Sequence, residues 1–103
     1  MNTETANPFI VQKEDIAGLK FPVQDVLILA NEKNQRKSFV ERALLLGNNY
    51  KHKVKINFED SESVKQVETT IWGLTDRHVI LKGGINIPLH RIFIANAGSP
   101  QFL

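Results

Sequence analysis

The chain has 103 residues, of which 23% are charged and 42% hydrophobic, a composition that suits one globular domain with one core. It contains no cysteine, which excludes a disulfide framework, a thiol nucleophile and a cysteine-ligated zinc site. The first residues are polar, unlike a secretory signal, and the longest apolar run, Val26–Ala30, is too short to span a bilayer. We therefore expect a cytoplasmic protein that does not enter the membrane.

The net charge of +2 is distributed unevenly along the chain. Residues 1–35 contain three basic and five acidic residues, a balance of −2. Residues 36–55 contain six basic residues and one acidic residue, a balance of +5, and residues 56–103 contain four basic and five acidic residues, a balance of −1. The positive charge lies in one block, which makes that block the first candidate for a functional surface.

Turn-forming residues suggest the domain boundaries. Residues 1–20 contain an Asn-Pro pair and a glycine and few apolar pairs, so we expect a loosely ordered segment. A single globular domain is expected over residues 21–96, with its β-part over residues 50–96, and a tail over residues 97–103. Within the domain, residues 31–37 are polar throughout and fit either a loop or an exposed helix.

Two segments favour short helices. Residues 22–33 begin with a proline, which suits a first helical turn, and their apolar residues fit a helical stripe, although a buried strand fits as well. Residues 38–46 open with Ser38 and Glu41 in a capping-box pattern and continue with apolar residues at helical spacing. Gly47 supplies a stop, so the pattern predicts a helix over residues 39–46, with a buried strand as the alternative.

After Tyr50 the apolar period changes from that of a helix to two, which indicates a first strand over residues 50–58. Because side chains alternate between the faces of a strand, Lys51, Lys53 and Lys55 are expected together on one face.

Three further strands are predicted. Residues 67–73 are rich in β-branched and aromatic side chains, and residues 78–82 alternate in the same way. Gly83-Gly84 indicates a tight hairpin leading to a strand over residues 85–87. The apolar parity then slips at Pro88, which predicts a turn of tight helix over Pro88–Arg91.

A last strand over Ile92–Ala95 would follow that turn. The whole order over residues 38–96, with the step Ile87-Pro88-Leu89-His90-Arg91-Ile92, resembles the small bent barrels of the Sm-like and SH3-like kind, including the layout of the Sm-like bacterial Rho-inhibitor proteins. The resemblance implies an α+β, mainly β fold: a small antiparallel bent sheet or barrel preceded by one or two short helices. It implies no binding residues, because the glycine of the Sm signature is absent after Asn57 and Asp60. The phrases Leu-Gly-Asn-Asn-Tyr-Lys and Val-Glu-Thr-Thr-Ile-Trp also resemble an uncharacterised bacterial family, which implies no function.

The basic block supplies the candidate site. A patch that neutralises phosphates is predicted at Arg42, Tyr50, Lys51, Lys53 and Lys55, with Tyr50 available for stacking on single-stranded nucleic acid. The alternative is a solvated strand face whose lysines discourage edge pairing.

Other candidates are weaker. The three histidines lack the spacing of a metal site, no nucleophile has a specified base, and the only tryptophan, Trp72, favours the core over a partner interface. We therefore expect a non-enzymatic binding module without catalytic residues, metal or cofactor, whose partner is RNA or an acidic protein surface. The alternative is a protein–protein or self-association module, a homo-oligomer.

Overall fold

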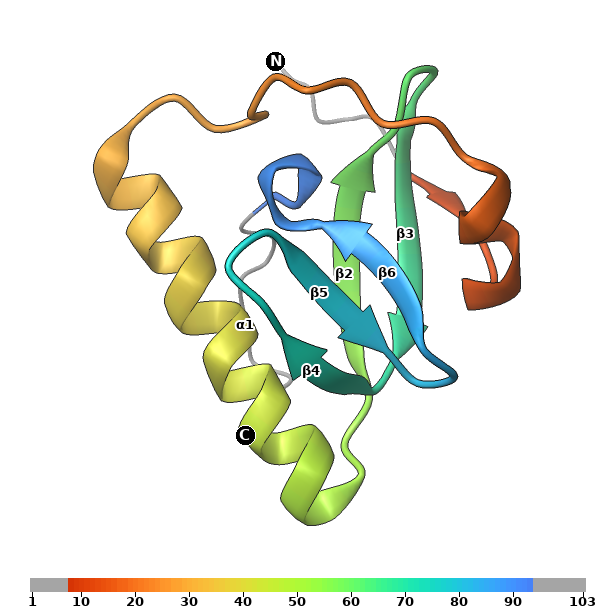
Figure 1. Cartoon of the computed structure of the whole chain (residues 1–103), viewed down its shortest axis with the longest axis vertical. Coiled ribbons are helices and arrows are strands. Elements are labelled where there is room, and N and C mark those ends of the chain that lie inside the picture. The colour runs from red at the N-terminus through yellow and green to blue at the C-terminus, as the bar shows by residue number, and fades with distance from the viewer. Residues whose placement is uncertain (1–7, 94–103) are drawn as a thin grey trace.

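One α-helix, two short 3₁₀ helices and two three-stranded sheets form the secondary structure of the described part of the chain, which is residues 8–93 of the computed structural model (Figure 1). The first sheet has the strand order β1-β3-β2 and the second the order β4-β5-β6. All the pairings are antiparallel except that of β1 with β3. The α+β class predicted from the sequence is therefore confirmed. The strands are β1 (Phe9–Ile10), β2 (Val54–Glu59), β3 (Val64–Thr69), β4 (Ile71–Leu74), β5 (His78–Leu81) and β6 (Ile85–Pro88).

The helix α1 (Ala30–Tyr50) is much longer than the predicted one. Its first turns are built from the polar residues 31–37, several of which are good helix formers, so the exposed-helix alternative holds there. Ser38 lies inside the helix, and its capping-box assignment was wrong. The predicted stop at Gly47 was also wrong, because α1 continues to Tyr50.

The helix predicted over residues 22–33 does not form before Ala30. Residues 21–29 contain neither helix nor strand. The carboxylate of Asp25 accepts a hydrogen bond of 2.8 Å from the backbone N–H of Leu27. Such a local bond stabilises a turn in place of the helical hydrogen-bond pattern.

The β-half follows the predicted order, with two differences. The segment predicted as one strand over residues 67–73 is two strands, β3 and β4, separated by Thr70. The first strand begins at Val54, because the helix and its cap occupy the chain as far as Lys51. The Gly83-Gly84 hairpin is confirmed, with φ of 90° and 85°, values in the left-handed region that favours glycine.

The chain returns to the first sheet after β6. The predicted tight turn is present as the 3₁₀ helix η2 (Leu89–Arg91), and Ile92 then forms an antiparallel bridge with Phe58 of β2. The N–H of Phe93 donates to the carbonyl of Asn57 at 2.9 Å. The rest of the predicted last strand, Ile94 and Ala95, lies outside the described residues. Within residues 8–93 the two sheets do not close into a barrel.

Residues 8–20 are more regular than the loosely ordered segment expected. β1 runs parallel to β3, and the 3₁₀ helix η1 (Lys13–Gly18) places Ile16 in the core with 1% of its surface exposed. A two-residue strand and a short 3₁₀ helix contain too few residues to show a hydrophobic period, so no pattern in this segment predicted them.

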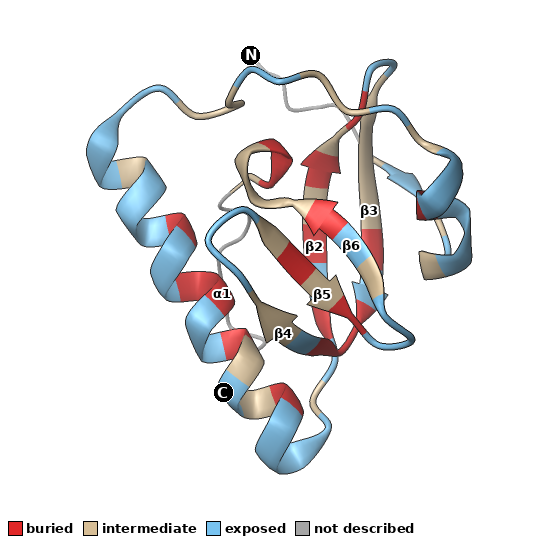
Figure 2. Cartoon of the chain, viewed as in Figure 1, coloured by how far each residue is buried: buried red, intermediate tan, exposed pale blue. Residues whose placement is uncertain are grey.

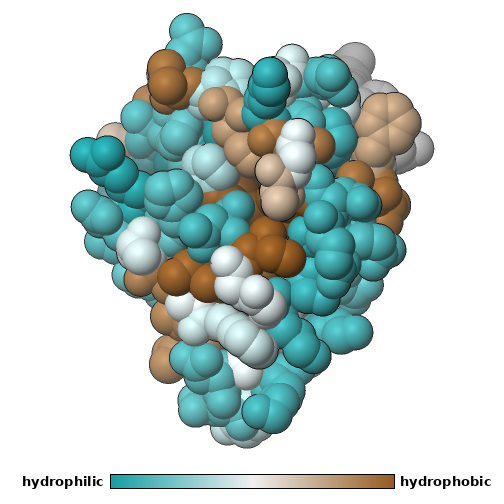
Figure 3. Space-filling model, turned by 45° about the vertical axis from the view of Figure 1, so that its right-hand side comes forward, coloured by the Kyte–Doolittle hydropathy of each residue, from teal (hydrophilic) through white to brown (hydrophobic). Residues whose placement is uncertain are grey.

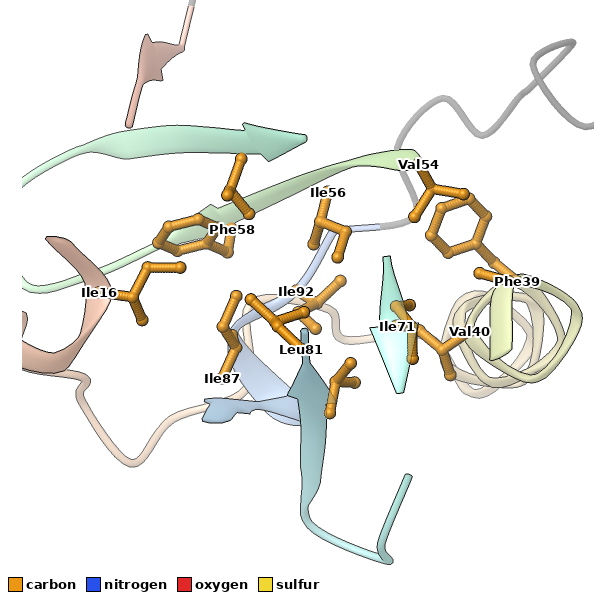
Figure 4. Close-up of a cluster of buried hydrophobic side chains, with 13 residues drawn as sticks. Ile16, Phe39, Val40, Val54, Ile56, Phe58, Ile71, Leu81, Ile87 and Ile92 are labelled. Atoms are coloured by element: carbon orange, nitrogen blue, oxygen red, sulfur yellow. The ribbon is translucent and has the colours of Figure 1, made fainter. Parts of the chain in front are cut away.

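The core lies between the two sheets and is closed at its ends by helices. Figure 4 shows Val54, Ile56 and Phe58 of β2 on one side, Leu81 and Ile87 opposite, Ile16 at one end and the helix side chains Phe39 and Val40 at the other. Figure 2 shows buried residues along one face of α1 only. Figure 3 shows a narrow band of apolar residues across another face of the molecule, surrounded by hydrophilic residues that also dominate its lower end.

The helix crosses β4 very closely. Gly47 is buried at this crossing, and a Cβ atom added to it would lie 2.5 Å from the carbonyl oxygen of Ile71 and 2.9 Å from Cγ2 of Thr70. Only glycine, which has no Cβ atom, allows the backbones of α1 and β4 to approach so closely. The end of α1 is thereby held against the start of β4.

Candidate functional site

The end of α1 determines where the first lysine lies. Lys51 has φ 56° and ψ 35°, the left-handed conformation, and it is the one non-glycine residue with positive φ within residues 8–93. Its N–H donates to the carbonyl of Gly47 at 3.0 Å, and the N–H of His52 donates to that of Leu46 at 3.2 Å. This arrangement caps the helix, a role that glycine or asparagine usually fills. Lys51 therefore holds a conformation that costs an L-residue about 1–2 kcal/mol.

The predicted strand face of three lysines does not exist. Lys51 caps the helix, Lys53 lies in the connection before β2, and only Lys55 belongs to the strand. Lys55 stands directly opposite Glu68 in the register of β2 with β3. Residues opposite each other in an antiparallel pair share a face, so Lys55 has an acidic neighbour on its own face.

Arg42 and Tyr50 lie on the exposed side of α1. Neither is among the residues that line the hollow described next. Arg36, another member of the basic block, is buried and pairs with Asp25. The block that looked continuous in sequence is thus divided among a buried ion pair, an exposed helix face and the helix end.

A hollow of about 530 Å³ lies between the end of α1 and the second sheet. It brings together two of the predicted lysines, Lys51 and Lys53, with a third lysine, Lys82, that was not among the predicted site residues. The backbone N–H of Lys82 donates to the carbonyl of Thr70 at 2.9 Å, which fixes the start of the hairpin beside β4. The lining consists of Gly47, Asn48, Lys51, Lys53, Thr70, Trp72 and Lys82.

The hollow is positively charged. Its lining contains no aspartate or glutamate, and its three lysines form no ion pair with an acidic residue of the described part of the chain. In contrast, Lys65 donates to Asp60 at 2.8 Å. The C-terminus of α1 contributes a partial charge of about −0.5, which is small beside three ammonium groups. An anionic group is the ligand that this lining favours.

Trp72 is exposed at the wall of this hollow, with 52% of its surface accessible. The expectation that it packs in the core was wrong. In the pairing of β4 with β5, Ile71 faces Leu81 and Gly73 faces Ile80, so Trp72 is the extra residue of an irregularity of the β-bulge kind. Bulges redirect side chains and occur next to functional sites. The register slip is invisible in sequence, where the strand pattern gave no sign of it.

A second hollow, of about 550 Å³, lies between the segment before α1, the β4–β5 turn and η2. Arg36 is one of its lining residues. It is 5% exposed and donates to both carboxylate oxygens of Asp25, at 2.9 and 2.8 Å, and to the carbonyl of Ile92 at 3.1 Å. Arg36 holds the pKa of Asp25 below its usual range. Because acids and bases balance here, we assign this hollow a structural role.

The histidines do not converge. His52 precedes β2, His78 begins β5, and His90 lies in η2, where its Nε2 atom is 2.9 Å from the carbonyl oxygen of Pro22. Across residues 8–93, no three histidine, aspartate or glutamate side chains are placed to hold a metal ion. No helix in the same range combines the length and apolar composition that crossing a membrane requires.

Comparison of the chain with family models, with curated proteins and with solved structures found no significant match in any of the three. A function for the protein is therefore inferred from the geometry of its own residues.

Proposed function

We propose that the protein is a small non-enzymatic module that binds nucleic acid, and that the hollow at the end of α1 is its binding site. The observation that carries this proposal is the convergence of Lys51, Lys53 and Lys82 beside the exposed Trp72, with no acidic residue in the lining. Lysines neutralise phosphates, and an aromatic side chain offers a surface for stacking.

The arrangement of elements is compatible with the resemblance to Sm-like proteins. In chain order it has a helix, an antiparallel pair, a bend, a glycine hairpin, a 3₁₀ turn and a return to β2. We infer a strand layout of the Sm-like kind from this order. The binding proposal depends on the hollow and not on that layout.

A salt titration tests the proposal. Three phosphate contacts on a single strand predict a slope of about −2 in log K against log[salt], which is roughly a 20-fold loss of affinity between about 50 and 200 mM salt. We expect the triple variant Lys51→Gln, Lys53→Gln, Lys82→Gln to lose most of this dependence in fluorescence anisotropy with a labelled oligonucleotide.

Lys55→Gln provides the matched control, because it removes one lysine that faces Glu68 outside the hollow. It should leave the affinity and the slope nearly unchanged. Equal losses of affinity in the control and in a single lysine variant of the hollow would show that binding depends only on the net charge of the protein. Absence of binding at about 50 mM salt would rule out the proposed function.

A self-association role has its own supporting observation. Val23 and Ile28, on the segment before α1, are 90% and 85% exposed. A second copy of the chain is the partner that would bury them. Sedimentation velocity over a range of concentrations should then show a dimer that Ile28→Lys abolishes, whereas a monomer at every concentration would exclude this role.

A further inference from the structure

We infer that the hollow accepts one unpaired nucleotide of a single strand, with its base stacked on the indole of Trp72 and the phosphates of that nucleotide and its immediate neighbours beside the three lysines. This inference rests on the proposed function and specifies its ligand class. Duplex nucleic acid presents phosphates but keeps its bases stacked inside, whereas the faces of unpaired bases are available to aromatic side chains.

The position of Trp72 supports stacking. Tryptophan is highly buried on average, yet about half of its surface is accessible here. Trp72 is itself the extra residue of the irregularity in β4. The next residue, Gly73, has no side chain, and a Cβ added to it would lie 3.3 Å from Cδ1 of Ile80. A base stacked on such an indole contributes about 1–3 kcal/mol.

The three lysines reach the hollow from separate, fixed points of the backbone. Lys51 is held by the helix cap, Lys53 lies two residues further along, and the N–H of Lys82 is bonded to the carbonyl of Thr70. Lys51 keeps a left-handed backbone in which glycine would be more stable. A strained residue that also lines a charged hollow points to a role in binding.

The size of the hollow agrees with one nucleotide. Its volume of about 530 Å³ lies within the range of sites that hold a single small organic ligand. A longer strand would leave its other nucleotides on the surface, so we expect weak dependence of affinity on length beyond the first few nucleotides. A stretch of contiguous bases held one after another would need more aromatic side chains than this lining supplies.

The test compares two probes of equal charge: a short oligothymidylate of about eight nucleotides and its abasic counterpart. Stacking predicts that the abasic probe binds roughly 5- to 150-fold more weakly, with the same salt slope. Trp72 is the only tryptophan, so its fluorescence should be quenched by oligothymidylate and not by the abasic probe.

The Trp72→Leu variant separates stacking from a structural effect. It should weaken binding of oligothymidylate and leave binding of the abasic probe unchanged, and Trp72→Phe should recover part of the loss. Circular dichroism of each variant checks that the fold is kept. Equal weakening of both probes would show that Trp72 only shapes the lysines and would overturn the inference.

The remaining outcomes are also decisive. If both probes bind equally and with the expected salt slope, the inference fails while the proposed function stands. If polyglutamate of matched charge binds as tightly as oligothymidylate, the hollow recognises acidic chains in general and the inference fails. If neither oligonucleotide binds at about 50 mM salt, the proposed function fails with it.

Discussion

Replacing Lys51 by asparagine should stabilise the fold and weaken binding at the same time. The backbone of Lys51 has φ 56° and ψ 35°. An L-residue pays about 1–2 kcal/mol in this region, and asparagine is among the side chains that tolerate it. The change also removes one positive charge from the hollow, which should lower the salt slope by about 0.7.

Lys53→Asn is the matched control, since it removes the same charge from the same hollow. Lys53 has no positive φ, so its replacement brings no relief of strain. Any loss of favourable interaction with the helix dipole, about 0.3–1 kcal/mol, should be comparable in the two variants. The difference between them then isolates the backbone effect, which we expect to be about 1 kcal/mol in favour of Lys51→Asn.

Urea unfolding followed by circular dichroism measures this difference in the free energy of unfolding. Thermal unfolding is a second measure, in which about 1 kcal/mol corresponds to roughly 4–8 °C in Tm for a domain of this size. Anisotropy with a labelled oligonucleotide measures binding. Equal stability of the two variants would refute the reasoning about strain. Unchanged affinity of both would refute the placement of the site.

Three further predictions concern the scaffold. Gly47→Ala should lower the free energy of unfolding by about 1–2 kcal/mol despite a better helix propensity, because the contact is with backbone, whereas Gly18→Ala, with open space around it, should be nearly neutral in urea unfolding. Arg36→Met should cost about 3 kcal/mol in the same assay, since it removes two hydrogen bonds to the carboxylate of Asp25 and the donor to the carbonyl of Ile92; a loss below 1 kcal/mol would contradict this. Burial raises the pKa of Asp60, but the hydrogen bonds donated to its carboxylate more than offset this effect and leave the pKa below its usual range. The folded state therefore binds a proton at Asp60 less readily than the unfolded chain does, so the free energy of unfolding should fall as the pH drops below about 4–5. Asp60→Asn should reduce this fall, measured as the urea midpoint at each pH.

Most of the β-half was predictable, because its signals are local. The glycine pair predicts a tight hairpin, and the parity slip at Pro88 predicts a turn of tight helix. Both predictions were confirmed. Helix ends were less accessible to prediction. Gly47 reads as a stop in sequence, yet it serves the close contact with Ile71, a reason that exists only in three dimensions.

The candidate site was half predictable for a related physical reason. Lys51 and Lys53 belong to the basic block and do line the hollow, but Lys55 is separated from them by the start of the strand. Trp72 belongs to β4 and Lys82 to the turn that follows β5, and no short-range pattern links them to the end of a helix more than twenty residues earlier. Their selection needed the bulge and the sheet register.

The connection between the two sheets through the single residue Thr70 has a consequence for dynamics. Because β3 leads directly into β4, and Ile92 returns to β2, neither sheet can open without exposing the core of the other. Amide protons of β2 and β5 should therefore exchange with solvent at a similar free energy, that of global unfolding. The walls of the hollow then come apart only when the whole domain unfolds, so a bound nucleotide should slow exchange throughout both sheets and not only at the helix end.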